Sequence, residues 1–305
     1  MIQKERVFTI PRIGIYTEIF KDFFEELGLK VILPPKPTEE TIKFGCRNSS
    51  DMMCYPYKVT LGNLKDAIDM GANTILMYDT VGQCRFRHYH KLYDLALKQH
   101  GYDIDIITAR ANIIFKLKKC SNRSYLKILR TIYKYYKIIV AKEKQVIIPD
   151  KVNIGLIGEI YTCLDDDVNY HIIDKFKKKD VNTYNTSVLK EFFKITIENK
   201  IHLNIWDRKY KKKARRYIED KIGGHGFENI CNTYKLIDKN IDGIVHLLPL
   251  SCMPESTVEP IINKICKENK IPLLRIPIDE TNSEANVNTR LEAFVELIKR
   301  KRGLQ

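Results

Sequence analysis

The sequence contains no apolar run that approaches the roughly 18 residues of a membrane-spanning helix. Its first fifteen residues, MIQKERVFTIPRIGI, hold no apolar stretch long enough for a signal peptide. Short-period repeats and low-complexity segments are lacking as well. We therefore expect a soluble, cytoplasmic protein that has no membrane partner.

Nucleotide-binding motifs are also missing. Neither the phosphate-binding pattern G-x-x-x-x-G-K-S/T nor the dinucleotide pattern G-x-G-x-x-G occurs. The segment GGHG at 223–226 is too short to count as a nucleotide loop. Any ATP hydrolysis connected with this chain would therefore have to belong to a partner.

Closely spaced metal-binding cysteines are absent too. The sequence has no C-x2-C pairs of the kind found in structural zinc sites, and it lacks the clustered cysteines of ferredoxins. Eight cysteines are nevertheless present. In a reducing cytoplasm they are not expected to form four disulfides, so each is a core residue, a metal ligand or a reactive thiol.

The composition is that of a globular protein. Hydrophobic residues make up 44% of the 305 residues and charged residues 30%, which is enough apolar material for real cores. The length exceeds the usual domain size of about 100 to 200 residues, so it predicts two domains.

Positive charge is in excess, with a formal net charge of +14. Such an excess favours anionic partners such as phosphates, nucleic acid or an acidic protein surface. The basic runs are scattered at 116–119, 175–179, 207–216 and 299–302, and most such runs are solvated helix faces. Because no zinc-finger spacing or aromatic RNA-binding signature accompanies them, we do not favour nucleic acid as a partner.

Short apolar runs rich in Ile and Val alternate with longer helical patterns, which is typical of βα units in a parallel sheet. The expected strands are 13–16, 30–33, 74–78, 104–107, one beginning at 152, 201–205, 243–250 and 272–276. The expected helices are 18–28, 91–101, 121–145, 187–199, 209–221, 255–269 and 289–302. The pattern predicts an α/β lobe over 1–120, a connecting helix within 121–150 and a second α/β lobe over 151–305.

Three cysteines occupy one kind of position in this scheme. Cys84 and Cys252 each follow an expected strand and precede a helix, and Cys54 stands before a helix whose first turn Pro56 suits. The unpaired N–H groups of a helix N-terminus favour thiolate over thiol, and so favour metal binding or nucleophilicity. Ligands of open α/β sheets gather at these βα loops, so the three thiolates could meet in a cleft between the lobes.

The residues alone leave two interpretations of these cysteines open. The gaps of 30 and 168 residues disfavour a zinc knuckle. An iron–sulfur cluster assembled from distant loops is one alternative, and it would leave an iron site open for water or substrate. Three unrelated buried thiols are the other.

At these cysteines the chain resembles the 2-hydroxyacyl-CoA dehydratase-like superfamily. The segments DMMCYPYKVTLGNL and GQCRFRHYHKLYDLALKQHGYDIDII resemble its first two cysteine segments. Further matches are GEIYT at 158–162, IGGHGFENI at 222–230, LSCMPE at 250–255 and TRLEAFVELI at 289–298. Together they are similar to the activase-associated branch, which is related to the 2-hydroxyglutaryl-CoA dehydratase D-component and to double-cubane cluster proteins.

The resemblance implies two flavodoxin-like lobes with an iron–sulfur cluster, of the 4Fe-4S or double-cubane type, at the interlobe cleft. Carried over residue by residue, the metal ligands are Cys54, Cys84 and Cys252. In the dehydratases a partner activase hydrolyses ATP and supplies an electron of very low potential. That electron reduces the substrate thioester to a ketyl radical, which then expels a hydroxyl group.

We therefore expect an iron–sulfur protein of anaerobic metabolism that takes part in ATP-coupled electron transfer or reductive dehydration with a separate activase. Whether the chain is itself a lyase or a reductase component is left open, as are its substrate and its fourth cluster ligand. A homodimer or a paired homologous subunit is expected, and an acyl-CoA is one candidate substrate. The alternative is a non-catalytic assembly or regulatory protein that keeps the fold and binds an activase or CoA-enzyme subunit.

Three further residues are candidate acid–base groups. The glycines on either side of His225 allow close backbone approach, so its imidazole could serve as a proton donor, although a tight turn needs the same glycines. Glu159 in GEIY is a candidate for acid–base catalysis. Glu255 could play a similar part or complement a helix N-terminus.

Overall fold

The computed structural model describes residues 5–78, 83–109, 112–194, 206–219 and 222–303. It divides into two compact units, one made of residues 1–81 and 85–143 and the other of residues 82–84 and 144–305. Cys84 therefore groups with the second unit although the chain around it belongs to the first. The observed division falls between residues 143 and 144, inside the segment 121–150 that was expected to connect the lobes. The boundaries at 120/121 and 150/151 stay a prediction.

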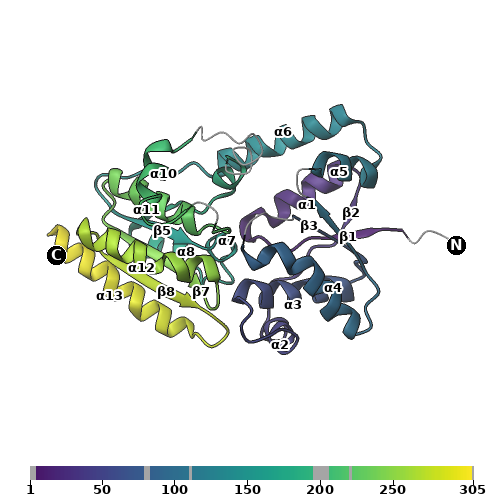
Figure 1. Cartoon of the computed structure of the whole chain (residues 1–305), viewed down its shortest axis with the longest axis horizontal. Helices are drawn as coiled ribbons and strands as arrows, with labels where there is room; N and C mark the ends of the chain where they lie inside the picture. The colour runs from purple at the N-terminus through teal and green to yellow at the C-terminus, as the bar shows by residue number, and fades with distance from the viewer. Residues whose placement is uncertain (1–4, 79–82, 110–111, 195–205, 220–221, 304–305) are drawn as a thin grey trace. The chain divides into compact units, whose positions relative to one another are not determined.

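The first unit is built on a four-stranded parallel sheet with the order β2-β1-β3-β4. The strands are β1 (Val7–Thr9), β2 (Lys30–Val31), β3 (Thr74–Tyr78) and β4 (Asp105–Ala109). Its helices are α1 (Thr17–Glu26), α2 (Glu39–Arg47), α3 (Tyr55–Asp69), α4 (Tyr89–Gln99), α5 (Ile113–Ser121) and α6 (Tyr125–Lys142), with 3-10 turns η1 (Gly14–Tyr16) and η2 (Arg85–His88). Helices α1, α5 and α6 lie on one side of the sheet, and α2, α3 and α4 on the other (Figure 1).

The core beneath α1, α5 and α6 follows from the spacing of apolar residues along each element. Phe23, Phe24 and Leu27 point inward from α1 at helical intervals and are at most 8% exposed. They pack with Leu117 of α5 and Ile128 of α6. The long basic helix α6 is thus held by apolar contacts to the first unit.

The second unit repeats the design of the first. Its parallel sheet has the order β6-β5-β7-β8, from strands β5 (Val152–Gly158), β6 (Val181–Asn185), β7 (Gly243–Pro249) and β8 (Leu273–Ile278). Its helices are α7 (Ile160–Leu164), α8 (Ile172–Lys178), α10 (Arg208–Ala214), α11 (Gly226–Asp238), α12 (Met253–Glu268) and α13 (Glu284–Arg302). In both units the first strand lies between the second and the third, which is the flavodoxin-like arrangement. The predicted α/β fold with two such lobes is confirmed.

Helices cover both faces of the second sheet. Gly155 of β5 faces Leu236 of α11, so a Cβ there would lie 2.5 Å from that side chain. Gly155 pairs with Ile244, so the neighbouring Gly243 faces the other side, where a Cβ would lie 2.5 Å from Ile298 of α13. The sheet is therefore buried between α11 on one face and α13 on the other, as expected of a doubly wound sheet.

Two predicted strands and one observed strand that was not predicted differ between sequence and structure. The strand expected at 13–16 is wrong, because Pro11 lacks an N–H group and the Thr17 hydroxyl donates to Gly14 O, folding the segment into η1. Strand β1 lies just before it, at Val7–Thr9. The strand expected at 201–205 lies outside the described residues. Strand β6 was not predicted, because its sequence VNTYN is largely polar and it lies at the edge of the second sheet.

No helix in the described ranges is long and apolar enough to cross a membrane.

Candidate functional site

Cys54 sits at the N-terminus of the longest helix on its side of the first sheet. It is the N-cap of α3, with extended backbone angles φ −66° and ψ 146°, and Pro56 occupies the first turn. The residue is 7% exposed. The Tyr89 hydroxyl lies 2.5 Å from its Sγ. The helix start predicted at Cys54 is thus confirmed, and the sulfur is met by a phenol from α4.

Three tyrosine rings pack together next to this sulfur. The rings of Tyr57 and Tyr93 stack with centroids 5.1 Å apart, and Tyr89 meets Tyr57 edge-on at 4.9 Å. Burial raises the pKa of Tyr57 and of Tyr93, and the charge of Cys54 adds to both shifts. The two phenols therefore stay protonated, and the packed rings hold the Tyr89 hydroxyl beside the Cys54 sulfur.

Cys252 also stands at a helix N-terminus, in the second unit. It is the N-cap of α12, with φ −77° and ψ 106°, and it is 6% exposed. The preceding Ser251 has a left-handed backbone with φ 61°, which costs about 1 kcal/mol or more for a residue other than glycine. The turn between β7 and α12 is therefore fixed in a strained shape that presents Cys252 at the helix start.

Cys84 is half-buried and directly precedes η2. Within the second unit it approaches the glycine-rich segment at 223–226. A Cβ built on Gly224 would lie 3.7 Å from the Cys84 Cβ and 2.7 Å from Cγ of Pro254 in the first turn of α12. The structure thus brings Cys84 and the helix start that carries Cys252 to the same glycine. The neighbouring Arg85 donates a hydrogen bond to the Met52 carbonyl in the loop before Cys54.

His225 is the N-cap of α11 and follows two glycines with left-handed backbone, Gly223 at φ 77° and Gly224 at φ 59°. Its half-buried ring stacks on Phe192 with centroids 6.0 Å apart. Burial lowers the pKa of His225, and the nearby Glu255 carboxylate partly opposes that shift. The imidazole is therefore neutral at physiological pH.

Glu159 begins α7 immediately after β5. Its carboxylate accepts hydrogen bonds from the backbone N–H groups of Tyr161 and Thr162 at 3.0 and 2.9 Å, and from the Thr162 hydroxyl at 2.9 Å. It is thus the N-cap of its own helix. Burial raises the pKa of Glu159, its three hydrogen bonds oppose the rise, and Glu255 adds to it.

The backbone before Glu159 requires glycine. Gly158 has φ 146°, and a Cβ there would lie 2.3 Å from the carbonyl oxygen of Leu247 in β7. The close approach of β5 and β7 at their carboxyl ends therefore depends on this residue.

A buried polar group near the carboxyl ends of β5 and β7 was not predicted from the sequence. His246 lies in the middle of the apolar strand β7 and is fully buried, and its Nε2 lies 2.7 Å from Oε2 of Glu255. Asn229 of α11 donates to both oxygens of that carboxylate at 2.8 and 3.0 Å. A single histidine in the apolar run IVHLLPL indicates a buried polar contact. Its partners could not be predicted, because Glu255 and Asn229 belong to other elements.

The other cysteines have core-like surroundings. Cys266 packs among apolar residues of α12, and burial raises the pKa of both Cys266 and Cys231 to about 12. Burial also raises the pKa of Cys163, against a hydrogen bond with Ser187. These thiols therefore stay protonated.

Among the described residues, no three His, Cys, Asp or Glu side chains gather around one point where a single metal ion could bind. A cluster of several irons spreads its cysteine ligands over different iron atoms, so it needs wider spacing than one ion. The thiols of Cys54, Cys84 and Cys252 have the donor chemistry that such a cluster requires.

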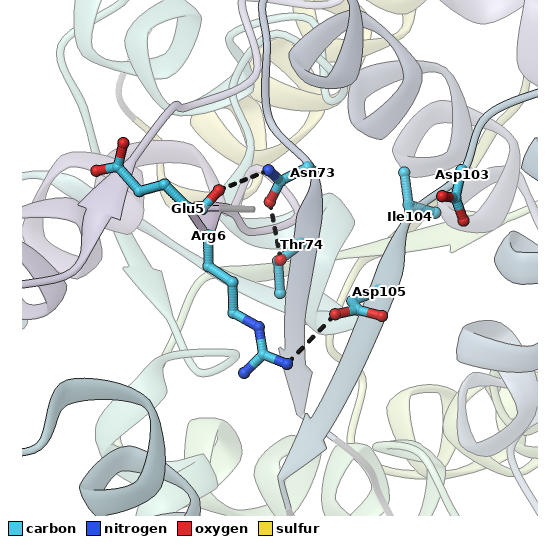
Figure 2. Close-up of a pocket in the computed structure, with 7 residues that line it drawn as sticks. All are labelled: Glu5, Arg6, Asn73, Thr74, Asp103, Ile104 and Asp105. Carbon is cyan, nitrogen blue, oxygen red and sulfur yellow. Dashed lines mark hydrogen bonds and ion pairs between the residues drawn. The ribbon is translucent and has the colours of Figure 1, made fainter. Parts of the chain in front are cut away.

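A hollow of about 480 Å³ lies elsewhere in the first unit, at the amino ends of β1, β3 and β4 (Figure 2). Its polar groups bond one another: Asn73 donates to Glu5 O at 2.8 Å, and Arg6 pairs with Asp105 at 3.3 Å. Ligands of parallel sheets bind at the opposite, carboxyl edge, so this hollow is not our candidate site.

The chain consists of two flavodoxin-like units, with Cys54 and Cys252 as the N-caps of α3 and α12, and these features define a class of α/β protein. Comparison with known families places the chain within that class. Residues 85–298 match the model of the family described as 2-hydroxyglutaryl-CoA dehydratase, D-component, and the chain belongs to this family. Residues 11–84 match the family described as CoA enzyme activase uncharacterised domain. No curated protein matches the chain.

Proposed function

We propose that the chain holds an iron–sulfur cluster through Cys54, Cys84 and Cys252. With a separate ATP-hydrolysing activase, it then takes part in low-potential electron transfer or reductive dehydration. The observation that carries the proposal is the shared placement of Cys54 and Cys252 as N-caps of α3 and α12. The match to the dehydratase D-component family supports the reaction class, and the match to an activase-associated domain supports the partner.

The helix starts favour this chemistry because they stabilise negative charge. The first N–H groups of a helix and its dipole favour thiolate over thiol, and thiolates bind iron. When bound, the cluster supplies reversible transfer of one electron, at a potential that hydrogen bonds to sulfur and solvent exposure adjust. The Tyr89 hydroxyl next to Cys54 Sγ is a group of the chain that can make such a bond.

Glu159 and His225 are the proposed acid–base groups. Burial raises the pKa of Glu159 and lowers that of His225, so their pKa values shift toward each other. The raised pKa moves the Glu159 carboxyl toward neutral pH, where a general acid or base works best, and the lowered pKa keeps the His225 imidazole neutral and able to accept a proton. Because Glu159 also caps α7, its replacement would affect both structure and any proton transfer.

The proposal includes a cytoplasmic, anaerobic setting and either a homodimer or a paired homologous subunit. An acyl-CoA is the proposed substrate if the chain is catalytic. If it is not, the protein assembles or regulates such an enzyme. Activase-dependent electron uptake distinguishes the two: a stable cluster that takes up no electron from a reduced activase with ATP would favour the assembly role.

Serine variants of the cysteines test the ligand set. After anaerobic reconstitution with iron and sulfide, Cys84→Ser and Cys252→Ser are expected to retain much less iron than the unmodified protein. Cys266→Ser is the matched control, because that thiol is equally small and is buried in an apolar core. Equal iron content in all these variants would contradict the assignment, and the measurement is iron and acid-labile sulfide per chain.

A further inference from the structure

The second unit buries three polar side chains against one another at the carboxyl edge of its sheet. His246 and Asn229 are fully buried and Glu255 is 1% exposed. Polar groups buried to this degree destabilise a fold unless they are hydrogen-bonded, and a buried carboxylate is the costliest of the three. Three such residues in one place call for an explanation beyond filling space.

Their hydrogen bonds join four elements. The Glu255 carboxylate comes from α12, the His246 ring from β7 at 2.7 Å and the Asn229 amide from α11 at 2.8 and 3.0 Å. The same amide donates to Gly158 O at 3.0 Å, at the end of β5. Within the described residues, His246 Nδ1 and Asn229 Oδ1 have no hydrogen-bond partner. The Glu255 carboxylate is therefore the shared attachment of both side chains.

Glu255 uses its carboxylate differently from Glu159. Glu159 accepts hydrogen bonds from N–H groups of its own helix and acts as a cap. Glu255 is the third residue of α12, yet it reaches to β7 and α11. A carboxylate that only complemented the helix dipole would need neither neighbour, so these contacts fix the direction of the first turn.

Close packing also holds this first turn of α12. A Cβ on Gly226 would lie 2.9 Å from the Pro254 carbonyl, and one on Gly224 would lie 2.7 Å from the Pro254 ring and 3.7 Å from the Cys84 Cβ. Cys252 is two residues before Pro254. A shift of the turn would therefore move Cys252 relative to Cys84.

We propose that His246, Asn229 and Glu255 form a positioning hub that fixes the first turn of α12 and thereby the place of Cys252. None of the three is required to touch the substrate or the cluster. The relevance of this position to a cluster rests on the proposed function, whereas the fixing of the turn does not.

Thiol accessibility in the cluster-free, full-length protein tests the hub directly. The alkylation rates of Cys252 and Cys266 by iodoacetamide are measured site by site with mass spectrometry, and Cys266 reports global opening. Glu255→Ala is expected to raise the ratio of the Cys252 rate to the Cys266 rate severalfold. Leu291→Ala, at a fully buried position of α13, is the control and should leave that ratio unchanged although it destabilises the fold.

Conservative variants separate positioning from general stability. Glu255→Gln keeps the side-chain length and an acceptor oxygen, so its ratio of Cys252 to Cys266 alkylation rates should stay near that of the unmodified protein. Asn229→Ala removes the hydrogen bonds from α11 but leaves that from His246, so it should raise the ratio less than Glu255→Ala does. An unchanged ratio in both Ala variants, or a Gln variant as reactive as Glu255→Ala, would overturn the proposal.

Cluster loading gives a second, distinguishable result. In reconstituted protein, Glu255→Ala should lower iron content or change the electron paramagnetic resonance spectrum, and Leu291→Ala should do neither. If the unmodified protein takes up no iron, the proposed function fails while the alkylation ratio still decides the hub. If all variants load alike and the ratios are equal, the hub fails while the cluster proposal stands.

Discussion

Single residues set the geometry of the candidate site. Cys54 and Cys252 are the N-caps of α3 and α12, where the first N–H groups of each helix favour a thiolate. His246 and Glu255 are nine positions apart in the sequence, and their side chains lie 2.7 Å apart because α12 folds back along β7.

His225 predicts a pH dependence of stability. Burial lowers its folded pKa below the ordinary value of 6.5, so the unfolded chain binds the proton more readily. Its contribution to stability is therefore present above that value and is lost as the pH falls through it. Urea denaturation at pH 8 and pH 5.5 should show a smaller loss of stability on acidification for His225→Asn than for the unmodified protein. Equal losses would contradict a neutral buried imidazole.

Gly158 predicts a large cost for a single methyl group. Gly158→Ala places a Cβ 2.3 Å from the Leu247 carbonyl at φ 146°, so we expect a loss of about 3 kcal/mol or more in the free energy of unfolding. Gly101→Ala is the control, because Gly101 has φ 78° but nothing within 4 Å of its Cβ position. That variant should lose only about 1 kcal/mol. Similar losses measured by urea denaturation would contradict the close contact.

Among the elements, the strands that the sequence predicts correctly are apolar β-branched runs buried on both faces of a sheet. Strands β3, β5 and β7 are of this kind, and they were found within a residue or so of their observed bounds. The edge strand β6 is half polar and gave no such signal. The segment 13–16 looked like a strand by composition, but the local hydrogen bond of the Thr17 hydroxyl outweighs that preference.

Ion pairs attach α6 to Glu26 at the end of α1. Glu26 accepts from Lys134 at 2.6 Å and from Lys127 at 2.9 Å, and these bonds lower its pKa to about 2. Its contribution to stability is therefore present above the ordinary value of 4.5 and is lost as the pH falls through about 2. Because the pair is solvent-exposed, Glu26→Gln should lower the thermal midpoint at pH 7 by no more than about 2 °C.

High salt supplies the control for that prediction. Screening weakens exposed ion pairs, so the difference between Glu26→Gln and the unmodified protein should shrink in 1 M sodium chloride. A difference that persists in high salt would show that Glu26 stabilises α6 by packing and not by charge.

The whole molecule repeats one sheet design twice. For this reason its length and its alternation of strand and helix patterns were enough to predict two lobes. Each unit has its own parallel sheet and its own apolar core. The sequence could not show that Cys84 groups with the second unit, because this depends on its contact with the glycine-rich segment and not on its place in the chain.

A fragment spanning residues 144–305 tests the independence of the second unit. It contains all of the second sheet and its core, so it should unfold cooperatively in urea with the helical and strand signals of a folded α/β domain. A fragment that shows no cooperative transition would contradict two self-sufficient cores.

The proposed iron–sulfur cluster on Cys54, Cys84 and Cys252 is tested by the low-temperature electron paramagnetic resonance spectrum of the reduced, anaerobically reconstituted protein. We expect a cluster signal that disappears when the three cysteines are replaced together by serine and that survives Cys266→Ser. A protein with no iron and no signal, or a signal that persists in the triple variant, would rule out these ligands.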